Sequence, residues 1–455
     1  MAEAGAARSS HQGMVNFFVS LFENYLPDPF AIAIGLTFVV AVLAYAIAPH
    51  GDPETLLTAW YNGAFNVLTF AFQMVLILVT GHALANSPLV KRGLDSLVSG
   101  IRTPAQAMVL MFVVVAIAAW LNWGLGLVIA AFLSRGIAQR VRVDYGWLVA
   151  GGYSAWSICN SGLSSSIALS QATHGSALNI VEKATGHILP MSQTVFTLFT
   201  ALPTFLVVVV MCFVFIRMRP ADADIVPFEH GEEAPAQGHG ADRGGRRSFA
   251  SLFESSPLVT VFIVLVGAAA IGREWVEKGV SVELNTLILL FLLAGMILQK
   301  TPVGYANAVR EAARQTGSII LQFPFYGGIM GVMVTSGLAG LISQFFVGVA
   351  SAGTLPAWSY VSSLIITFLV PSAGGHWAVQ GPFVIPAAQT LNASIPATAM
   401  AVAMAENVAN MLQPFWAVPL VAIAGIGIQR VLGYTVVTFL VSLIIYGAAV
   451  LFLTI

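Results

Sequence analysis

Apolar runs long enough to cross a lipid bilayer recur along this chain from residue 30 to its C-terminal end. A helix that spans the hydrocarbon core needs about 20 predominantly apolar residues. Hydrophobic residues make up 58% of the 455 residues and charged residues 9%, whereas about 25% of the residues of a soluble domain are charged. The sequence therefore predicts an all-α polytopic membrane protein whose partner is the lipid bilayer. The net charge of −1 gives no indication of a nucleic-acid partner.

The expected spans fall into two groups, separated by a segment of different composition. Charged, glycine and proline residues replace the apolar pattern at 217–256, which we expect to be a cytoplasmic linker, and residues 1–29 form an N-terminal tail. The first group comprises 30–48, 63–85, 105–134, 145–175 and 190–216. The second group comprises 257–272, 285–299, 316–337, 356–388, 397–425 and 430–455.

Two of these runs contain a matching interruption by small and polar residues. One interruption is Leu121-Asn-Trp-Gly-Leu-Gly126 and the other is Pro371-Ser-Ala-Gly-Gly-His-Trp377. A backbone that leaves the helix inside lipid loses its hydrogen-bond partners, so such breaks persist only where protein or a water-filled cavity surrounds them. Broken helices are also where many transporters bind their substrates. The two interruptions therefore predict a binding site.

Basic residues gather on the cytoplasmic side of membrane proteins, and they indicate how the interrupted runs lie. The first run has basic residues on both flanks, whereas the second lies in a stretch, 343–391, without lysine or arginine. We therefore expect two re-entrant hairpins, 105–134 entering from the cytoplasm and 356–388 entering from the opposite side. The flanking residues are Lys91, Arg92, Arg102, Arg135, Arg140 and Arg142 for the first hairpin, and Lys300, Arg310, Arg314 and Arg430 around the second.

Entry from opposite sides is what an inverted repeat requires. We pair 30–216 with 285–455, so that 257–272 is the connecting span that inverts the second repeat. Asn160 follows Asn122 by 38 residues (160 − 122), and Asn410 follows Ser372 by the same number (410 − 372). The expected architecture has about nine full spans, two hairpins and two discontinuous helices, with a cytoplasmic N-terminus and a periplasmic C-terminus.

The span after each hairpin is rich in residues that weaken a helix. Residues 157–166 include five serines, an asparagine and a glycine, and residues 406–414 include two asparagines and a proline. Serine and asparagine compete for backbone hydrogen bonds, and proline cannot donate one. We therefore expect broken helices at 145–175 and 397–425, whose exposed N–H and carbonyl groups can hold an anion and a cation close together. The alternative is close helix packing by small residues.

We expect the substrate to lie where the hairpin tips meet the broken helices. For the glycines at the tips, the geometry of the turn without ligand contact is the alternative. The candidate substrate-binding residues are Asn122, Trp123 and Gly124, then Asn160, Ser161, Gly162, Ser164, Ser165 and Ser166, then Ser372, Gly374, Gly375 and His376, and finally Asn407 and Asn410.

Glu406 is the only acidic residue deep within the core spans of the second half. An ionisable group in the bilayer costs at least about 2.5 kcal/mol on insertion scales, so it is a functional candidate by default. We expect it to bind a coupling proton or sodium ion together with Asn122, Ser372 and Asn410. A carboxylate that caps the broken helix is the alternative. His376 can donate to a carboxylate and titrate near neutral pH, or it can fix the hairpin by hydrogen bonds.

The sequence predicts no metal site, no cofactor beyond the coupling ion and no enzyme. The linker residues His230, Glu232, Glu233 and His239 lack metal-site spacing. Ser164 to Ser166 with His376 would supply a nucleophile and a base, but the chain has no Gly-x-Ser-x-Gly elbow and no evident acidic partner for that histidine.

Four segments together resemble the bacterial short-chain fatty acid transporter family, within the ion transporter superfamily. They are Leu121–Leu127, Val143–Ser154, Gly162–Ile167 and Pro371–Pro382, and the resemblance covers nearly all of the chain outside the tail and the linker. It implies a permease of the bacterial cytoplasmic membrane for acetoacetate, butyrate or similar small monocarboxylates. The superfamily implies a scaffold, a moving transport domain, an elevator mechanism and often a homodimer. The Ser-Asn-Thr hairpin motif of its sodium-dicarboxylate members is absent.

The expected function is secondary active uptake of small monocarboxylates across the inner membrane, coupled to protons or sodium. Few fixed cationic side chains occur in the predicted core, which favours a monoanion over a dianion. The alternatives are a dicarboxylate or amino-acid symporter and an uncoupled small-anion channel.

Overall fold

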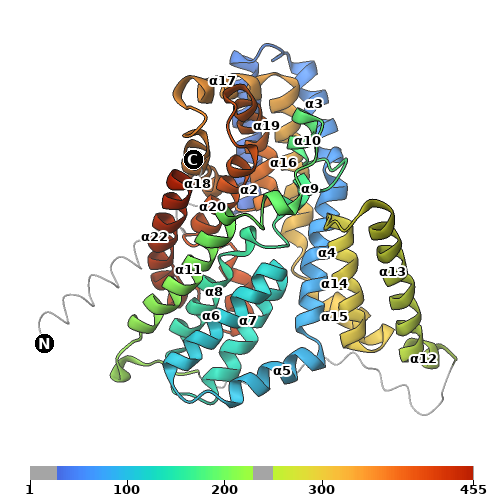
Figure 1. The fold of residues 1–455 in the computed structure, drawn as a ribbon, viewed down its shortest axis with the longest axis vertical. Helices are drawn as coiled ribbons and strands as arrows, with labels where there is room; N and C mark the ends of the chain where they lie inside the picture. The colour runs from blue at the N-terminus through green and yellow to red at the C-terminus, as the bar shows by residue number, and fades with distance from the viewer. Residues whose placement is uncertain (1–27, 229–248, 414, 454–455) are drawn as a thin grey trace, which may run out of the picture.

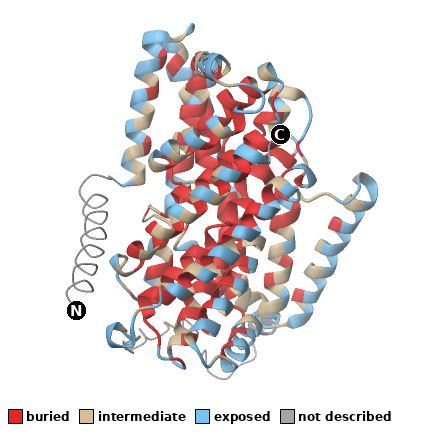
Figure 2. Ribbon diagram, turned by 60° about the vertical axis from the view of Figure 1, so that its left-hand side comes forward, coloured by how far each residue is buried: buried red, intermediate tan, exposed pale blue. Residues whose placement is uncertain are grey.

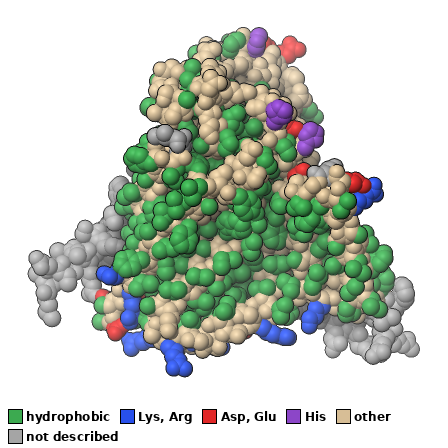
Figure 3. All heavy atoms as spheres, in the orientation of Figure 1, with side chains coloured by type: hydrophobic (Ala, Val, Ile, Leu, Met, Phe, Trp, Pro, Cys, Tyr) green, Lys and Arg blue, Asp and Glu red, His purple; other side chains and the backbone are tan. Residues whose placement is uncertain are grey.

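The computed structural model describes residues 28–228, 249–413 and 415–453, and within these ranges every regular element is a helix. Figure 1 shows most helices running along the length of the molecule. Buried residues occupy its centre (Figure 2), while hydrophobic side chains also cover the middle of its outer surface (Figure 3). An apolar exterior around a packed interior is the arrangement of a polytopic membrane protein, so the predicted all-α membrane fold is confirmed.

Among the described residues, seven helical stretches are long and apolar enough to cross a membrane. Six lie where full spans are expected, and the seventh, α6, lies in the first expected hairpin. Of the other expected spans, one is the 16-residue α14 (Leu284–Gln299) and two are broken helices. The seven are α2 (Pro29–Ile47), α3 (Pro53–Asn66) with α4 (Leu68–Ala85), α6 (Pro104–Leu121), α11 (Leu198–Arg217), α13 (Pro257–Lys278), α16 (Gly317–Thr335) and α22 (Gln429–Phe452).

The first hairpin consists of α6 and α7 (Trp123–Ala138), between which the chain turns at Asn122. Asn122 is extended (φ −152°, ψ 120°), and its side chain caps α7. The two arms pack so closely that a Cβ atom on Gly126 would lie 2.7 Å from the Cα atom of Ala119. α5 (Pro88–Ser99), which leads into the hairpin, lies at the lower end of the molecule in Figure 1. The hairpin therefore starts from the lower end.

The second hairpin consists of α18 (Leu355–Leu369) and α19 (Ala373–Leu391). Ser372 occupies the position that Asn122 has in the first hairpin: its backbone is nearly identical (φ −151°, ψ 116°), and its side chain caps α19. α17 (Leu338–Val349), which precedes this hairpin, lies at the upper end in Figure 1. The two hairpins therefore start from opposite ends of the molecule.

A broken helix follows each hairpin. The first consists of α8 (Tyr145–Trp156), a 3-10 turn η1 (Cys159–Ser161) and the short α9 (Ser166–Ala172). The second consists of α20 (Ile395–Ala409) and α21 (Ala417–Ala424). Each break falls inside the range expected from its serines, asparagines or proline.

Equivalent elements recur at a fixed distance along the chain. α7 begins at residue 123 and α19 at 373, and α8 begins at 145 and α20 at 395, a separation of 250 in both cases (373 − 123 and 395 − 145). α5 and α17 begin at 88 and 338, with the same separation. The pairing of 30–216 with 285–455 places these same elements opposite one another.

The helices pack in two groups. In the outer group, α2, α3, α4, α14, α15 (Pro302–Ala313) and α16 pack against one another, and α13 packs against α14. The hairpin group contains the two hairpins, the two broken helices, α11 and α22. The groups meet where α4 contacts α7 and where α16 contacts α19. Each hairpin therefore rests against one long helix of the outer group.

Three expected spans have different ends in the structure. The span expected from residue 63 begins at Pro53, because α3 and α4 follow each other with only Val67 between them. α11 begins at Leu198 and not at 190, since the side chain of Thr197 caps it there. The segment before it contains α10 (Ile180–Thr185) and the short turn η2 (Met191–Gln193). α13 continues six residues beyond the expected 272, to residue 278.

The structure describes the two ends of the linker, 217–228 and 249–256. Residues 229–248, including His230, Glu232, Glu233 and His239, lie outside the described residues, as do residues 1–27 of the N-terminal tail. The described parts of the linker contain the short helices η3 (Asp222–Asp224) and α12 (Phe249–Glu254). Val226 donates its N–H to Asp144 Oδ2 at 3.0 Å, so the first part of the linker packs against the start of α8.

Candidate functional site

A small cavity lies where the two hairpin tips meet the two broken helices. Its volume is about 30 Å³, of the order of one water molecule. Both tips, both broken helices and the two long helices α4 and α16 contribute to its wall. The lining residues are Met74, Trp123, Trp156, Cys159, Asn160, Ser166, Ile319, Phe323, Ser372, Ala373, Asn410 and Trp416.

Five of the candidate residues from the sequence lie on this wall: Trp123, Asn160, Ser166, Ser372 and Asn410. Four further wall residues are their near neighbours along the chain. The remaining three come from α4 and α16, which are uninterrupted helices of the outer group. Sequence reasoning missed these three because an apolar residue in a continuous apolar helix carries no local sign of a site. They are Met74, Ile319 and Phe323.

Three helix N-termini reach the cavity wall. Trp123 is the first residue of α7, Ala373 is the first residue of α19, and Trp416 is the residue before α21. N–H groups in the first turn of a helix have no acceptor within the helix, and the N-terminus carries a partial positive charge. Converging N-termini therefore favour an anion in this cavity without any charged side chain.

Polar side chains on the wall also have unused hydrogen-bonding capacity. The Oδ1 atom of Asn410 is buried and has no hydrogen-bond partner, which costs about 1–3 kcal/mol for a buried polar group. The hydroxyl of Ser166 has only the sulfur atom of Met74, at 3.3 Å. Polar groups held in this state are suited to a ligand or a water molecule that enters the cavity.

Tryptophan rings form the apolar part of the wall. Trp156 donates its indole N–H to the carbonyl of Trp123 at 2.7 Å, and Trp416 donates its own to the carbonyl of Pro371 at 2.9 Å. The rings of Trp123 and Trp416 meet edge to face, with centroids 5.3 Å apart. Trp377, at the second tip, is instead buried beside Leu178, whose carbonyl accepts its N–H at 3.1 Å.

Other candidate residues hold the broken segments together. The side chain of Asn407 accepts from the backbone N–H of Asn160 at 3.0 Å and donates to Ser161 Oγ at 2.9 Å, so it joins the two broken helices. Ser164 Oγ accepts from the N–H of Trp123 at 2.9 Å, which joins the first tip to the first broken helix. Ser165 caps α9 through its side chain.

The tip glycines and Asn122 pack the hairpins against the outer group. A Cβ atom on Gly374 would lie 2.7 Å from the ring of Phe70, and one on Gly375 would lie 2.4 Å from the ring of Tyr326. Asn122 donates to the carbonyl of Ile77 on α4 at 3.0 Å. These three candidates lie off the cavity wall. Two more glycines allow similar approaches: Gly124 to Leu78 and Gly162 to Trp120.

His376 and Glu406 form a fully buried pair beside the cavity. His376 Nδ1 lies 2.8 Å from Glu406 Oε2, and both side chains have no exposed surface. The hydroxyl of Thr367, on α18, lies 2.9 Å from the same Glu406 oxygen. The prediction that His376 has no acidic partner is wrong, because Glu406 is that partner. The two residues are 30 positions apart in sequence and meet because the second hairpin packs against α20. The hydroxyls of Ser164, Ser165 and Ser166 instead contact Trp123, Ala168 and Met74. No group of His, Cys, Asp or Glu able to hold a metal occurs in the part of the chain that the structure describes.

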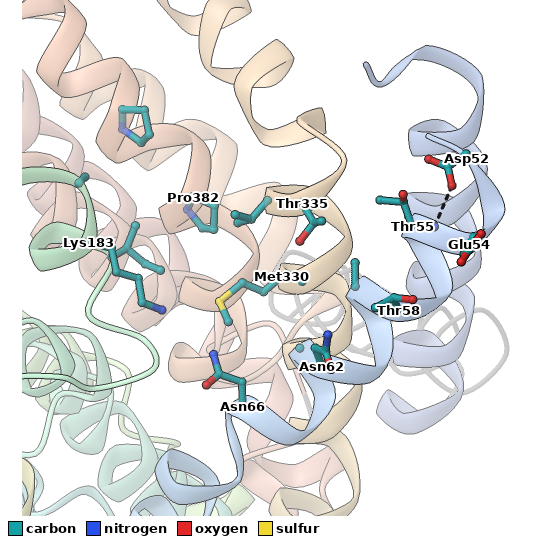
Figure 4. Close-up of a pocket in the computed structure, with 17 residues that line it drawn as sticks. Asp52, Glu54, Thr55, Thr58, Asn62, Asn66, Lys183, Met330, Thr335 and Pro382 are labelled. Atoms are coloured by element: carbon teal, nitrogen blue, oxygen red, sulfur yellow. Dashed lines mark hydrogen bonds between the residues drawn. The ribbon is translucent and has the colours of Figure 1, made fainter. Parts of the chain in front are cut away.

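A large groove opens at the upper end, between α3 and α16 on one side and α10 and α19 on the other. Its volume is about 1020 Å³. Figure 4 shows the side chain of Lys183 directed toward Asn66 across this groove, with Asp52 and Glu54 at its far rim. Burial lowers the pKa of Lys183 below its usual value, and the neighbouring Glu182 carboxylate opposes this effect.

A second opening, of about 370 Å³, borders the cavity. It shares Ile319 and Trp416 with the cavity wall. Gln413, whose Oε1 atom is buried without a partner, also lines it. Two side chains therefore separate the small cavity from this opening.

Comparison with known proteins gives matches over nearly the whole chain. Residues 11–453 match the family model described as "Short chain fatty acid transporter". Two relatives named "Putative short-chain fatty acid transporter" are 39% identical (Escherichia coli strain K12) and 36% identical (Haemophilus influenzae), each over 95% of this chain and 98% of the relative. The solved YdaH transporter of Alcanivorax borkumensis shares the fold, with a TM-score of 0.60 and 16% identity over 93% of this chain and 98% of its own.

Proposed function

Because this chain belongs to the short-chain fatty acid transporter family, we propose that it takes up small monocarboxylates such as acetoacetate and butyrate by cation-coupled transport. The observation that carries the proposal is the cavity enclosed by both hairpin tips and both broken helices. A carboxylate there would meet the N-termini of α7, α19 and α21, the side chains of Asn160 and Asn410 and the hydroxyls of Ser166 and Ser372. A short acyl tail would rest on the tryptophan rings.

The wall chemistry supports a monoanion over a dianion. Among the described residues that line the cavity, none is a lysine, arginine or histidine. Helix N-termini contribute partial charges of about half a unit each, which can balance one carboxylate more readily than two. An amino acid would also need a hydrogen-bond acceptor for its ammonium group. On the cavity wall, the acceptor without a partner is the amide oxygen of Asn410.

The two packing groups support an elevator-type movement. The cavity lies at their boundary, with Met74 and Phe323 supplied by the outer group and the polar residues supplied by the hairpin group. With about 30 Å³, the cavity is too small for a four-carbon acid, so its walls must separate for loading and release. A shift of the hairpin group along α4 and α16 would expose the polar wall first to the upper groove and then to the second opening.

Charge supports one orientation in the bacterial inner membrane. Lysine and arginine side chains gather at the lower end of the molecule in Figure 3, and such residues favour the cytoplasmic side. The end of α22 near the C-terminus lies toward the upper end in Figure 1, which we assign to the periplasm. We also propose a homodimer, for which α13 offers a long, mostly exposed apolar face.

Uptake of labelled butyrate into proteoliposomes tests the function, with pH and sodium gradients imposed separately. We expect uptake above that of protein-free liposomes, inhibited by acetoacetate and not by succinate or amino acids. Inhibition by succinate at equal potency would favour the dicarboxylate symporter instead. Flux that never exceeds equilibrium under either gradient would favour the uncoupled channel. Ser372→Ala is expected to weaken uptake, with Ser351→Ala, in the exposed turn before α18, as the matched control.

A further inference from the structure

The hydrogen bonds around His376 fix how many protons the buried pair holds. Gln380 donates its amide NH₂ group to the backbone carbonyl of Ser359 at 3.0 Å, and a carbonyl can only accept. The Gln380 amide oxygen therefore faces the other way, where it accepts from the hydroxyl of Ser363 and lies against His376 Nε2. His376 Nε2 must carry a hydrogen in order to donate to that oxygen.

The other ring nitrogen faces the glutamate. His376 Nδ1 lies 2.8 Å from Glu406 Oε2, and two bare lone pairs at that distance would repel each other between two fully buried side chains. One hydrogen must therefore lie between them, on the imidazole or on the carboxyl group. The pair is neutral overall with this proton and carries one negative charge without it. The hydroxyl of Thr367 also lies near both atoms, 3.1 Å from His376 Nδ1 and 2.9 Å from Glu406 Oε2. Its single hydrogen can be donated to either atom or to the carbonyl of Ser363, and in none of these positions does it replace the hydrogen that the 2.8 Å contact requires.

No other charged group faces this pair among the described residues around it. α18 contributes Thr367, α19 contributes Gln380, and α20 contributes the neutral residues next to Glu406. The titratable groups on neighbouring elements that interact electrostatically with Glu406 are Cys159 of η1 and Tyr326 of α16. Thiol and phenol groups are ordinarily neutral at physiological pH. Loss of the shared proton would therefore leave a negative charge with no compensating cation.

The pair is also connected to the substrate cavity at both of its ends. His376 lies one turn after Ser372, to whose carbonyl it donates its backbone N–H at 2.7 Å. Glu406 lies one turn before Asn410, whose backbone N–H donates to the carbonyl of Glu406 at 3.1 Å. Ser372 and Asn410 both line the cavity. The proton thus holds together the second tip and the second broken helix, which are two of the cavity's walls.

We propose that the proton shared by His376 and Glu406 is the coupling ion of this transporter, taken up from one side of the membrane and released on the other with each monocarboxylate. The inference rests on the proposed function. With the proton bound, the tip and α20 are held together and the cavity can close over its anion. When the proton leaves, the unpaired charge drives the pair apart, and the cavity opens. One proton per monocarboxylate makes the transport cycle electroneutral.

The test with the unaltered protein follows protons and substrate together. Proteoliposomes containing a trapped pH-sensitive dye receive labelled butyrate without sodium, and protein-free liposomes correct for diffusion of the undissociated acid. We expect acidification of the interior in proportion to protein-dependent uptake, at about one proton per butyrate, and a rate unaffected by membrane potential. Protein-dependent uptake that requires sodium, or that moves no protons, would overturn the inference and leave the proposed function intact. No protein-dependent uptake under any gradient would instead reject the proposed function.

A substitution tests the assignment to these residues. Glutamine at position 406 has no ionisable group, so Glu406→Gln cannot take up and release the shared proton. Butyrate exchange by this variant is therefore expected to lose its dependence on pH. Stimulation by an inward proton gradient should fall from several-fold to none. The matched control is Glu277→Gln at the exposed end of α13, which should keep both properties. A Glu406→Gln variant with the unaltered pH profile would overturn the proposal, and if this variant fails to fold, the dye measurement still decides.

Discussion

At the scale of single residues, the side chains of the site divide into two kinds. Asn160, Ser166 and Asn410 face the cavity, while Asn407 and its neighbours hold the broken backbone in place. Ser372 does both, because it lines the cavity and caps α19. The sequence showed that both kinds belong together, because each interrupts an apolar run. It did not separate them, since a serine that caps a helix and one that contacts a ligand look alike in sequence.

Asn410→Asp tests which of the two roles Asn410 has. This substitution replaces the amide of Asn410 on the cavity wall by a carboxylate, which would repel an anionic substrate. We therefore expect the KM for butyrate to rise at least about tenfold, equivalent to about 1.4 kcal/mol. Asn62→Asp, in the upper groove, is the control and should change KM little. An unchanged KM in Asn410→Asp would show that the substrate carboxylate binds elsewhere.

Gly375 makes a different kind of residue-scale prediction. An added Cβ atom would lie 2.4 Å from the buried ring of Tyr326, and overpacking of this kind costs about 1–3 kcal/mol. Gly375→Ala should therefore lower the unfolding temperature in detergent and slow butyrate exchange. Gly340→Ala, on α17 in open space, should do neither. Equal behaviour of the two variants would mean that the tip and Tyr326 separate at no cost.

At the scale of elements, the two hairpins have the same backbone arrangement at their tips but different cap residues. A cap residue in extended conformation, Asn122 or Ser372, ends the first arm and begins the second. The interruptions by small and polar residues, together with the distribution of basic residues around them, made both hairpins predictable. The contacts of the tips with α4 and α16 were not predictable, because they join segments far apart in sequence.

Substitutions at Asn122 separate capping from attachment to α4. Asn122→Ala removes both the cap and the bond to Ile77, and should destabilise the protein by about 1–3 kcal/mol. Asn122→Ser keeps a capping oxygen and loses only the bond to Ile77, so its unfolding temperature should fall between those of Asn122→Ala and the unaltered protein. Asn307→Ala, on the exposed side of α15, is the control. Identical losses for the alanine and serine variants would show that the cap contributes nothing.

At the scale of the whole molecule, the orientation in the membrane and the transport mechanism depend on the end of the molecule from which each hairpin starts. α5 and α17, which lead into the two hairpins, lie at opposite ends of the molecule (Figure 1). The positions of the basic residues alone predicted this arrangement. The division into an outer group and a hairpin group appears only in the packing.

Cysteine labelling tests this arrangement in the membrane. In a background with Cys212→Ser, cysteines at Arg102 and Arg135 should react with an impermeant reagent from one side only. Cysteines at Ser351 and Leu391 should react only from the other side. Cys159 lines the cavity and is also replaced by serine, so that any label reports only the introduced cysteines. Labelling of positions 102 and 135 from opposite sides would rule out the first hairpin.

The sequence by itself determined the class of fold, the family, the positions of four backbone breaks and five of the residues that line the cavity. It could do so because apolar runs, helix-breaking residues and basic flanks are local properties that the bilayer makes costly to misplace. Only the tertiary structure decided that Met74 and Phe323 complete the cavity, that the tip glycines pack on aromatic rings, and that Glu406 is the partner of His376. These are contacts between distant segments, set by how the hairpins pack against α4, α16 and α20.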